Sequence, residues 1–386
     1  MMVVGVLTLA VAARGSVELG GLTSAMVGAG VACFGPFIGA IADRFGQRST
    51  LLIIGTVNSV ALGALAWIAF SPLSDGVMLA ASFVVGATAP QISPLSRSRL
   101  VGVVQTKLPR EQRPRTLNAT LAYESTGDEV VFVFGPVVVG LLATQFGAWA
   151  PIVGAAILTL IFVSLFAVHR TSPPARTAEQ QRTALAPVTE LWRPALLITV
   201  FGIFSVGMFF GSMLTSLTAF MQDLGAPEQA GLLYGAMGVT SALLAIGVTW
   251  FSPKFTLRYR WLTFAALLSF GGVVLQTVAD TTGMLWALAL LGLGIGPLLV
   301  TLYGFGAART PLGRSATVMT MLGSGVIVGQ SLAAALTGVV AEHLGTNASL
   351  MLPLAAALCA LVSGIVNWFV TPAGRLTPST GPITVA

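Results

Sequence analysis

Residues 39–51 read GAIADRFGQRSTL, a short charged turn between two long apolar segments. The segments on either side, 22–41 and 51–70, contain no charged residue. Each has the length, roughly 20 residues, that an α-helix needs to cross a bilayer. This stretch therefore predicts two membrane-spanning helices joined by a polar loop, and the rest of the chain repeats the pattern.

The composition supports the same interpretation. Of 386 residues, 55% are hydrophobic and only 8% are charged. In a soluble globular domain about a quarter of the residues are charged. The sequence therefore excludes a soluble globular protein and predicts an all-α integral membrane protein.

Charged and turn-forming residues divide the chain into twelve apolar segments that are long enough to span a membrane. Their expected limits are 1–20, 22–41, 51–70, 76–96, 117–143, 149–168, 195–221, 229–251, 261–279, 284–307, 315–341 and 349–370.

The distribution of positive charge predicts the topology. If the N-terminus is cytoplasmic, all but one of the 19 Lys and Arg residues fall in cytoplasmic loops or the C-terminal tail, the exception being Arg14. Cytoplasmic loops carry an excess of Lys and Arg, so we expect a bacterial inner-membrane protein with both termini in the cytoplasm. The net charge of +6 then reflects topology and gives no reason to expect a nucleic-acid partner.

A polar stretch near the middle, HRTSPPARTAEQQRTALAPVTELWRP, divides the chain into six segments before it and six after it. Its Pro, Gln and Arg residues are typical of a linker, with a short surface helix expected near TELW. The predicted organisation is an N-terminal bundle, a cytoplasmic linker, a C-terminal bundle and a cytoplasmic tail, over residues 1–169, 170–194, 195–371 and 372–386.

The two halves resemble each other at one place. Residues 140–147 read GLLATQFG and residues 338–345 read GVVAEHLG, an offset of 198 residues. Both stretches end a predicted span, which is where a duplicated six-helix unit would place them. Transporters built from such repeats bind substrate between the repeats, near the middle of the bilayer.

Metal and nucleotide chemistry have little support in the sequence. Cys33 and Cys359 fall in opposite halves, and His169 and His343 lie at opposite membrane faces, so no metal cluster is expected. The chain also lacks the G-x-x-x-x-G-K-(S/T) phosphate loop. We expect no cofactor, no ATP-driven pump and no enzyme.

The loop quoted above resembles the signature of the major facilitator superfamily, G-x-L-A-D-R-x-G-R-(R/K)-x-x-L. Ile41 and Gln47 depart from the signature, and the matching residues are Gly39, Ala42, Asp43, Arg44, Gly46, Arg48 and Leu51. The resemblance implies two six-helix bundles that expose a central site alternately to each membrane face. It also implies that the loop latches the two halves together when the cytoplasmic side is closed. The alternative is a loop that only fixes topology.

Each residue of this loop has a physical role that does not depend on the family. Gly39 lets its helix approach a neighbour closely, and Gly46 permits the chain reversal. Asp43 can face a helix N-terminus or an arginine, while Arg44 and Arg48 anchor the loop on the cytoplasmic side.

A second unusual stretch, ESTGDEVVFVFGP at 124–136, puts three acids inside a predicted span. A charged acid at the centre of an inserted helix costs roughly 2.5–3.5 kcal/mol. At 100° per residue, Glu124 and Asp128 lie about 40° apart and Glu129 about 140° from Glu124. All three therefore share one broad side of the helix, which must face protein or a watery cavity.

Two interpretations of these acids remain open. Crowded and partly desolvated carboxylates favour their protonated forms, so one of them, with Asp128 the best candidate, could carry a coupling proton or face a cationic substrate. Alternatively, the acids form a buried polar network with neighbouring spans, with Arg14 and Glu18 as partners paired at i, i+4 on one helix. The offset of 198 residues places Leu322, Val326 and Ile327 opposite the acids, so the chemistry is confined to one half.

The residues that follow these acids form a third motif. Gly135, Pro136 and Gly140 resemble the tail of the G-P-x-x-G-G motif of antiporter branches of the superfamily, with Val139 at the first closing glycine. An ordinary kinked packing helix explains them equally well.

The fourth span departs from drug-antiporter relatives, which carry an arginine within it, because no Arg precedes Arg97 here. Pro90, Gln91 and Pro94 favour a broken helix that lines a cavity. Further cavity candidates are Arg14 and Tyr303. The block from 90 to 136 resembles a group of superfamily members common in actinobacteria, a resemblance that supplies no substrate.

We therefore predict a monomeric secondary transporter that exports a small amphipathic or cationic compound in exchange for protons. The first alternative is a proton-coupled importer of a sugar or other metabolite. A second, of another class, is a non-transporting membrane partner or sensor built on a transporter fold. The expected partners are a small-molecule substrate, protons and the lipid bilayer.

Overall fold

The structure, a computed structural model, describes residues 2–15, 17–172, 185–225, 230–252 and 254–371. Within these ranges the regular structure is helical. The N-terminal helices are α1 (Met2–Arg14), α2 (Val17–Phe45), α3 (Gln47–Ala69), α4 (Asp75–Ala87), α5 (Ile92–Lys107), α6 (Arg113–Phe146), α7 (Ala150–Leu158), a π-helical turn η1 (Thr159–Val163) and α8 (Ser164–Val168).

The C-terminal helices follow a short 3₁₀ helix, η2 (Val188–Trp192), which confirms the surface helix expected near TELW. They are α10 (Pro194–Asp223), α11 (Ala230–Gly247), η4 (Val248–Trp250), α12 (Leu257–Leu275), α13 (Thr281–Arg309), α14 (Ser315–Leu344), α15 (Thr346–Ser349) and α16 (Met351–Val370).

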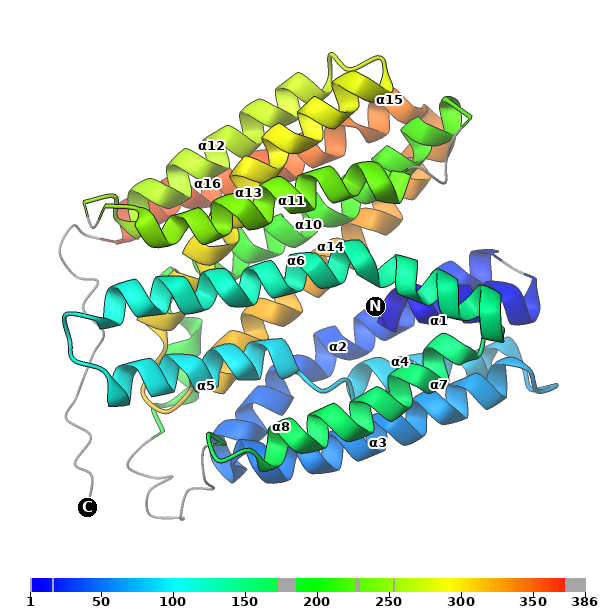
Figure 1. The fold of residues 1–386 in the computed structure, drawn as a ribbon, viewed down its shortest axis with the longest axis horizontal. Helices are drawn as coiled ribbons and strands as arrows, with labels where there is room; N and C mark the ends of the chain where they lie inside the picture. The colour runs from blue at the N-terminus through cyan, green and yellow to red at the C-terminus, as the bar shows by residue number, and fades with distance from the viewer. Residues whose placement is uncertain (1, 16, 173–184, 226–229, 253, 372–386) are drawn as a thin grey trace.

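Among the described residues, nine helical segments are long and apolar enough to cross a membrane. α1, α6 and α12 run alongside them in the same bundle (Figure 1). The arrangement is consistent with the twelve expected spans, and the all-helical membrane fold is confirmed.

The helices form two groups, with α6 and α14 running between them (Figure 1). α11 to α13 and α16 lie on one side, and α2 to α5, α7 and α8 lie on the other. Contacts between the groups are made mainly by α2 with α14 and by α6 with α11. Two pairs of helices from opposite halves of the chain therefore hold the molecule together.

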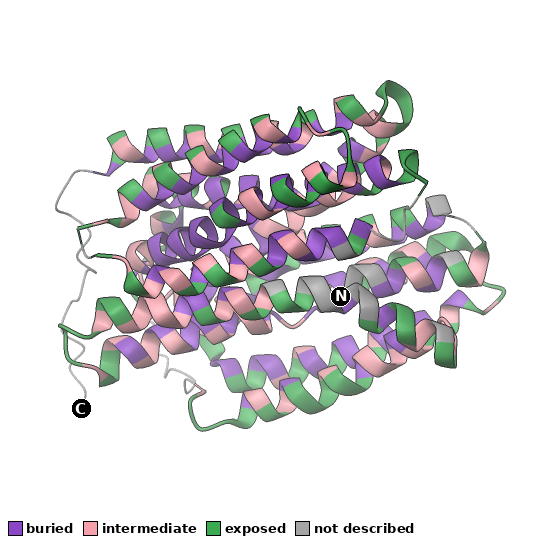
Figure 2. Cartoon of the chain, turned by 45° about the horizontal axis from the view of Figure 1, so that its top comes forward, coloured by how far each residue is buried: buried purple, intermediate pink, exposed green. Residues whose placement is uncertain are grey.

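Buried apolar side chains form a main core in each group of helices, and a third cluster joins α2, α3, α5, η1 and α8 to Ala316 of α14. The larger core belongs to α10–α16, and it also takes in Val101 of α5 with Leu121 and Ala122 of α6. The smaller core joins α1, α2, α3, α4 and α7. Buried residues lie mainly on the inward helix faces and exposed residues on the outer faces (Figure 2). Many of the exposed residues are large and apolar, as expected where lipid replaces water.

Glycines allow the closest helix contacts within each group. A Cβ built on Gly86 of α4 would lie 2.0 Å from the carbonyl oxygen of Val27 in α2, and one on Gly207 of α10 would lie 2.2 Å from that of Val326 in α14. Only glycine permits backbones to approach this closely, and this kind of packing drives helix association in membranes.

The internal repeat is visible in how two helices end. α6 ends at Gly147 (φ 100°) and α14 at Gly345 (φ 85°), and each glycine donates its N–H to the carbonyl four residues earlier. Positive φ favours glycine, so the offset of 198 residues corresponds to the same helix end in both halves.

The first expected boundary between spans is wrong. α1 ends at Arg14, Gly15 has φ 69°, and α2 begins at Val17, several residues before the predicted break at 20–22. Arg14 and Glu18 therefore belong to different helices and cannot form the expected pair along one helix. The side chain of Glu18 lies outside the described residues.

The expected end of the fourth span is also wrong. The predicted helix break is confirmed, since α4 ends at Ala87 and α5 begins at Ile92. However, α5 continues to Lys107, so Arg97 and Arg99 are buried helix residues and not part of a cytoplasmic loop. The predicted boundary stopped at the first charged residue, but these charges have partners inside the protein.

One end of the bundle, which we name the basic end, carries most of the positive charge. It comprises the helix termini and turns that hold Arg44, Arg48, Lys107, Arg113, Lys254 and Arg309, and it lies at the left in Figure 1. It is the end that the distribution of Lys and Arg predicts to be cytoplasmic.

Arg309 connects three helices by hydrogen bonds at the basic end. Its guanidinium donates to the carbonyl of Ala195 (2.5 Å) and to the hydroxyls of Thr199 and Thr371 (both 2.6 Å). It also donates to the amide oxygen of Asn367. One side chain thus joins the end of α13 to α10 and α16.

We expect Arg309→Ala to lower the free energy of unfolding by about 2–4 kcal/mol, because buried acceptors lose their donor. Thermal unfolding in detergent, followed by tryptophan fluorescence, measures the change. Arg110→Ala removes an exposed arginine at the same end and should leave the melting temperature nearly unchanged. Equal melting temperatures for the two variants would contradict the role of Arg309.

Candidate functional site

Arg97 of α5 and Asp128 of α6 form an ion pair in which the arginine is buried and the carboxylate is partly exposed. Arg97 Nη2 lies 2.5 Å from Asp128 Oδ2. Arg97 Nη1 donates to the Ser93 hydroxyl (2.7 Å), which donates in turn to Asp128 Oδ1 (3.1 Å). Ser93 and Arg97 are one turn apart on α5, so their spacing directs both side chains toward the same carboxylate.

The guanidinium also lies against an aromatic ring from the other half of the chain. Arg97 Cζ is 4.0 Å from the ring centroid of Tyr303 in α13. The Arg97 side chain is only 1% exposed and Tyr303 is also buried. A cation–π contact of this kind gains strength when water is excluded.

A second carboxylate completes the group. Glu124 lies one turn before Asp128 on α6 and accepts a hydrogen bond from the Ser96 hydroxyl (2.9 Å). Asp128 keeps 39% of its side chain exposed, whereas Arg97 is almost fully enclosed. We name this group the interface cluster; its members are Ser93, Ser96, Arg97, Glu124, Asp128 and Tyr303. It has two carboxylates and one guanidinium.

The predicted site residues have different outcomes. Glu124, Asp128 and Tyr303 lie in the interface cluster, whereas the side chain of Glu129 lies outside the described residues. Gln91 is buried at the start of α5, where its amide donates to the carbonyl of Ala89.

Arg14 lies away from this cluster. Its guanidinium donates to the carbonyls of Ile68, Ser71 and Leu73, at and just after the end of α3. Its contacts are thus those of a cation at the carbonyl end of a helix.

Sequence reasoning missed Arg97 because it was placed in a cytoplasmic loop, and it did not single out Ser93 and Ser96 near the end of the fourth predicted span. One signal could have found them. Serines at 93 and 96 and an arginine at 97 share a face of any helix that continues through this region, as do the acids at 124 and 128.

The signature loop contacts the N-terminus of α14. Asp43 accepts hydrogen bonds from the backbone N–H of Ala316 (3.0 Å) and of Thr317 (2.7 Å), and from the Thr317 hydroxyl (2.7 Å). The expectation that this acid faces a helix N-terminus is confirmed. A carboxylate at this position is favoured by the helix dipole and satisfies free N–H groups.

The other signature residues support the same contact. A Cβ on Gly39 would lie 2.0 Å from the Thr320 hydroxyl and 2.7 Å from the carbonyl oxygen of Ala316. Gly46 has φ 89° and makes the reversal between α2 and α3. Arg44 and Arg48 are exposed at the basic end.

The antiporter-like motif lies on α6, which is helical from Arg113 to Phe146. Gly135 is buried, and the side chain of Pro136 lies outside the described residues. A Cβ built on Gly140 would meet no atom within 4 Å, so space is open beside this glycine.

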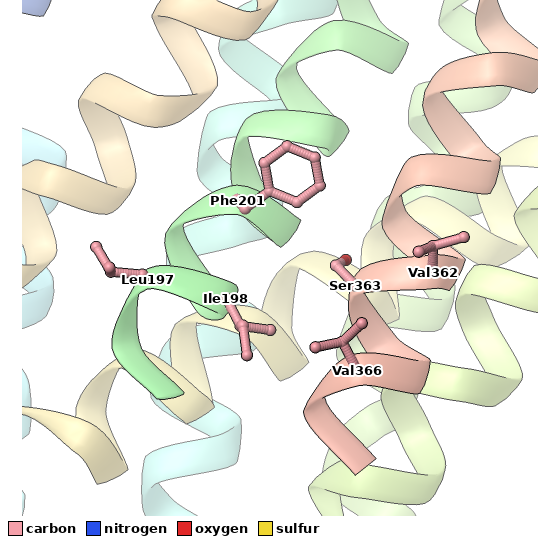
Figure 3. A pocket seen from close by; sticks show the side chains of 6 residues that line it. All are labelled: Leu197, Ile198, Phe201, Val362, Ser363 and Val366. Atoms are coloured by element: carbon pink, nitrogen blue, oxygen red, sulfur yellow. The ribbon is translucent and has the colours of Figure 1, made fainter. Parts of the chain in front are cut away.

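A groove lies between α10 and α16 (Figure 3), and most of the side chains that line it are exposed. It is lined by Leu197, Ile198, Phe201, Val362, Ser363 and Val366. The single hydroxyl in this lining, on Ser363, donates to the carbonyl of Ala360. With an apolar lining that faces the membrane, the groove offers no group to orient a polar solute, and the interface cluster is the better candidate site.

The close contact at Gly39 leads to a prediction. We expect Gly39→Ala to separate α2 from α14 at the basic end, because its Cβ would overlap a backbone carbonyl. Spin labels at Ser49→Cys and Leu312→Cys, both exposed at this end, would then report a longer distance by electron–electron double resonance. The experiment needs Cys33 and Cys359 replaced by serine.

Gly21→Ala is the matched control, because a Cβ at Gly21 meets no atom within 4 Å. Its distance distribution should match that of the parent protein. The same distribution for Gly39→Ala would show that the close contact does not hold the basic end.

Comparisons with known proteins place this geometry in a family. The sequence profile of the Major Facilitator Superfamily matches residues 1–324. A multi-drug resistance efflux pump, PmrA of Streptococcus pneumoniae, is 27% identical over 243 residues, which cover 58% of this chain and 55% of that protein. The alignment thus spans about half the length of this curated relative.

Solved structures of transporters share the fold. The human organic anion transporter MFSD10 superposes with a TM-score of 0.66 at 16% identity, covering 89% of this chain and 83% of that one. The fucose:proton symporter FucP of E. coli gives a TM-score of 0.64 at 14% identity, covering 96% of this chain and 98% of that one. The chain belongs to the Major Facilitator Superfamily, whose members are membrane transporters and not enzymes.

Proposed function

We propose that the protein is a proton-coupled secondary transporter and that the interface cluster is its coupling site. The observation that carries the proposal is the pairing of one enclosed guanidinium with Asp128, while a second carboxylate, Glu124, lies one turn away and bonds to Ser96. Asp128 pairs with Arg97 but remains partly exposed, which would allow it to exchange a proton with water. An ionisable group inside a membrane bundle marks a proton or substrate pathway by default.

The net charge of the interface cluster indicates which kind of ligand it attracts. With both carboxylates ionised, the interface cluster carries one more negative charge than positive. A proton or a cationic group of the substrate would cancel the excess, and the two would then compete for the same place. Such competition is the basis of exchange, because the protein carries one species in each direction.

The contacts between the halves fit alternating access. We propose that residues 1–169 and 195–371 move as two bundles, with the basic end in the cytoplasm of a bacterial cell. Asp43 holds the N-terminus of α14 at this end, and Gly39 allows the helices to meet there. In this proposal the structure represents a state whose cytoplasmic side is closed.

Export is the direction that we favour. The likeness to a multi-drug efflux pump supports it, together with an excess of negative charge that suits a cationic or amphipathic compound. A search for the substrate should therefore begin with lipophilic cations.

The proposal predicts the behaviour of Asp128→Asn in cells. Wild type should lower the accumulation of a fluorescent lipophilic cation, and a protonophore should abolish this effect. Asp128→Asn cannot exchange a proton, so its cells should accumulate as much dye as cells without the transporter. Expression and membrane insertion must be matched between the variants.

Glu342→Gln provides the control, because it removes an exposed acid at the opposite end of the bundle. It should export like wild type. If Asp128→Asn also exports like wild type, the acid is not the coupling group. If wild type matches empty cells across a panel of such dyes, cation export is excluded.

A further inference from the structure

Tyr303 is the contact through which the C-terminal helices touch the charged pair. Its ring lies over the guanidinium of Arg97, whose two Nη atoms bond to Ser93 and Asp128. Arg97 thus belongs to one half of the molecule and is enclosed by the other. Movement of α13 away from α5 would expose a charge that is 1% exposed in this structure.

We propose that Tyr303 is a positioning residue that makes opening of the basic end depend on the charge of Asp128. The inference rests on the proposed function, because it assigns how the proton on Asp128 acts. With Asp128 ionised, the enclosed Arg97 has a counter-charge and a ring, and the basic end stays closed. With Asp128 protonated, the enclosed cation loses its ion pair and gains by becoming hydrated.

The groups that surround Arg97 limit the alternatives. α6 contributes Asp128 and Glu124, and α13 contributes Tyr303. Glu124 accepts a hydrogen bond from Ser96 and does not replace the ion pair of Arg97 with Asp128. α14 meets α5 where Pro94 packs on Gly323, and its titratable residues, Glu342 and His343, lie at its far end. α2 reaches this region at Gly35.

The neighbouring contact between α2 and α14 has no hydrogen bond from the Ser324 hydroxyl, which increases the importance of the ring. Gly35 of α2 faces Ser324 of α14, and the Ser324 hydroxyl is buried without a hydrogen-bond partner. Near the interface cluster, the described contacts between α14 and the N-terminal helices are thus packing contacts. The contact between Arg97 and Tyr303 adds an attraction that separation of the halves must break.

Cysteine labelling can follow the opening of the basic end. Val101 lies one turn after Arg97 and is buried in the core of the C-terminal helices, so a cysteine there becomes reactive only when the halves separate. The reporter is Val101→Cys in a protein whose Cys33 and Cys359 are replaced by serine. Labelling with a maleimide is measured in inverted vesicles, which present the cytoplasmic end to the reagent, between pH 5 and pH 8.

With Tyr303 intact, acid should speed labelling, and Asp128→Asn should be labelled rapidly at every pH. Tyr303→Phe keeps the ring and should behave like the parent. Tyr303→Leu and Tyr303→Met remove it and should be labelled at least about tenfold faster at pH 8, with little dependence on pH. Phe305→Leu removes a buried ring two residues along α13 that does not cover Arg97, and should keep the response to pH.

The outcomes separate the two proposals. If the parent shows no response to pH and Asp128→Asn labels like the parent, the coupling role of Asp128 fails. If the parent and Asp128→Asn respond as expected but Tyr303→Leu and Tyr303→Met label like the parent, only the role of Tyr303 is overturned. Two ring-removing variants ensure that misfolding of one leaves the other to decide.

Discussion

A charge buried away from water needs a partner, and this constraint determines how the helices around Arg97 are arranged. Arg97 is enclosed between the two halves, and an isolated ion in such a place costs many kcal/mol. The protein meets this requirement with Asp128, a serine hydroxyl and an aromatic face. Each partner comes from a particular turn of a particular helix, so the register of α5 against α6, and the approach of α13, follow from the needs of one side chain.

Other parts of the architecture serve this arrangement. The break between α4 and α5 allows a second helical segment to begin at Ile92 and to present Ser93, Ser96 and Arg97 on one face. Small residues let α2 and α14 meet, and Asp43 binds the end of α14 that lies nearest the basic end. A closed basic end and an enclosed Arg97 are thus parts of one state.

The sequence predicted what depends on local pattern. Apolar length and the distribution of Lys and Arg predicted the helices, Pro90 and Pro94 predicted the break in the fourth span, and the loop at 39–51 predicted both the family and the position of Asp43. The sequence-based prediction was wrong where the place of a residue depends on partners that are distant in the sequence. Arg97 was taken for a loop residue because its partners lie on other helices, and Arg14 was paired with Glu18 because the turn at Gly15 was missed.

A double-mutant cycle on Arg97 and Asp128 tests the central claim most directly. Unfolding in detergent would be measured for Arg97→Met, Asp128→Leu and the combined variant. If the two form a coupled pair, Asp128→Leu should cost about 3–5 kcal/mol by leaving the buried Arg97 without its partner, and Arg97→Met should cost less because Asp128 is partly exposed. The combined variant should lose much less than the sum. Losses that simply add would contradict the account, because they would show that the two charges do not depend on each other.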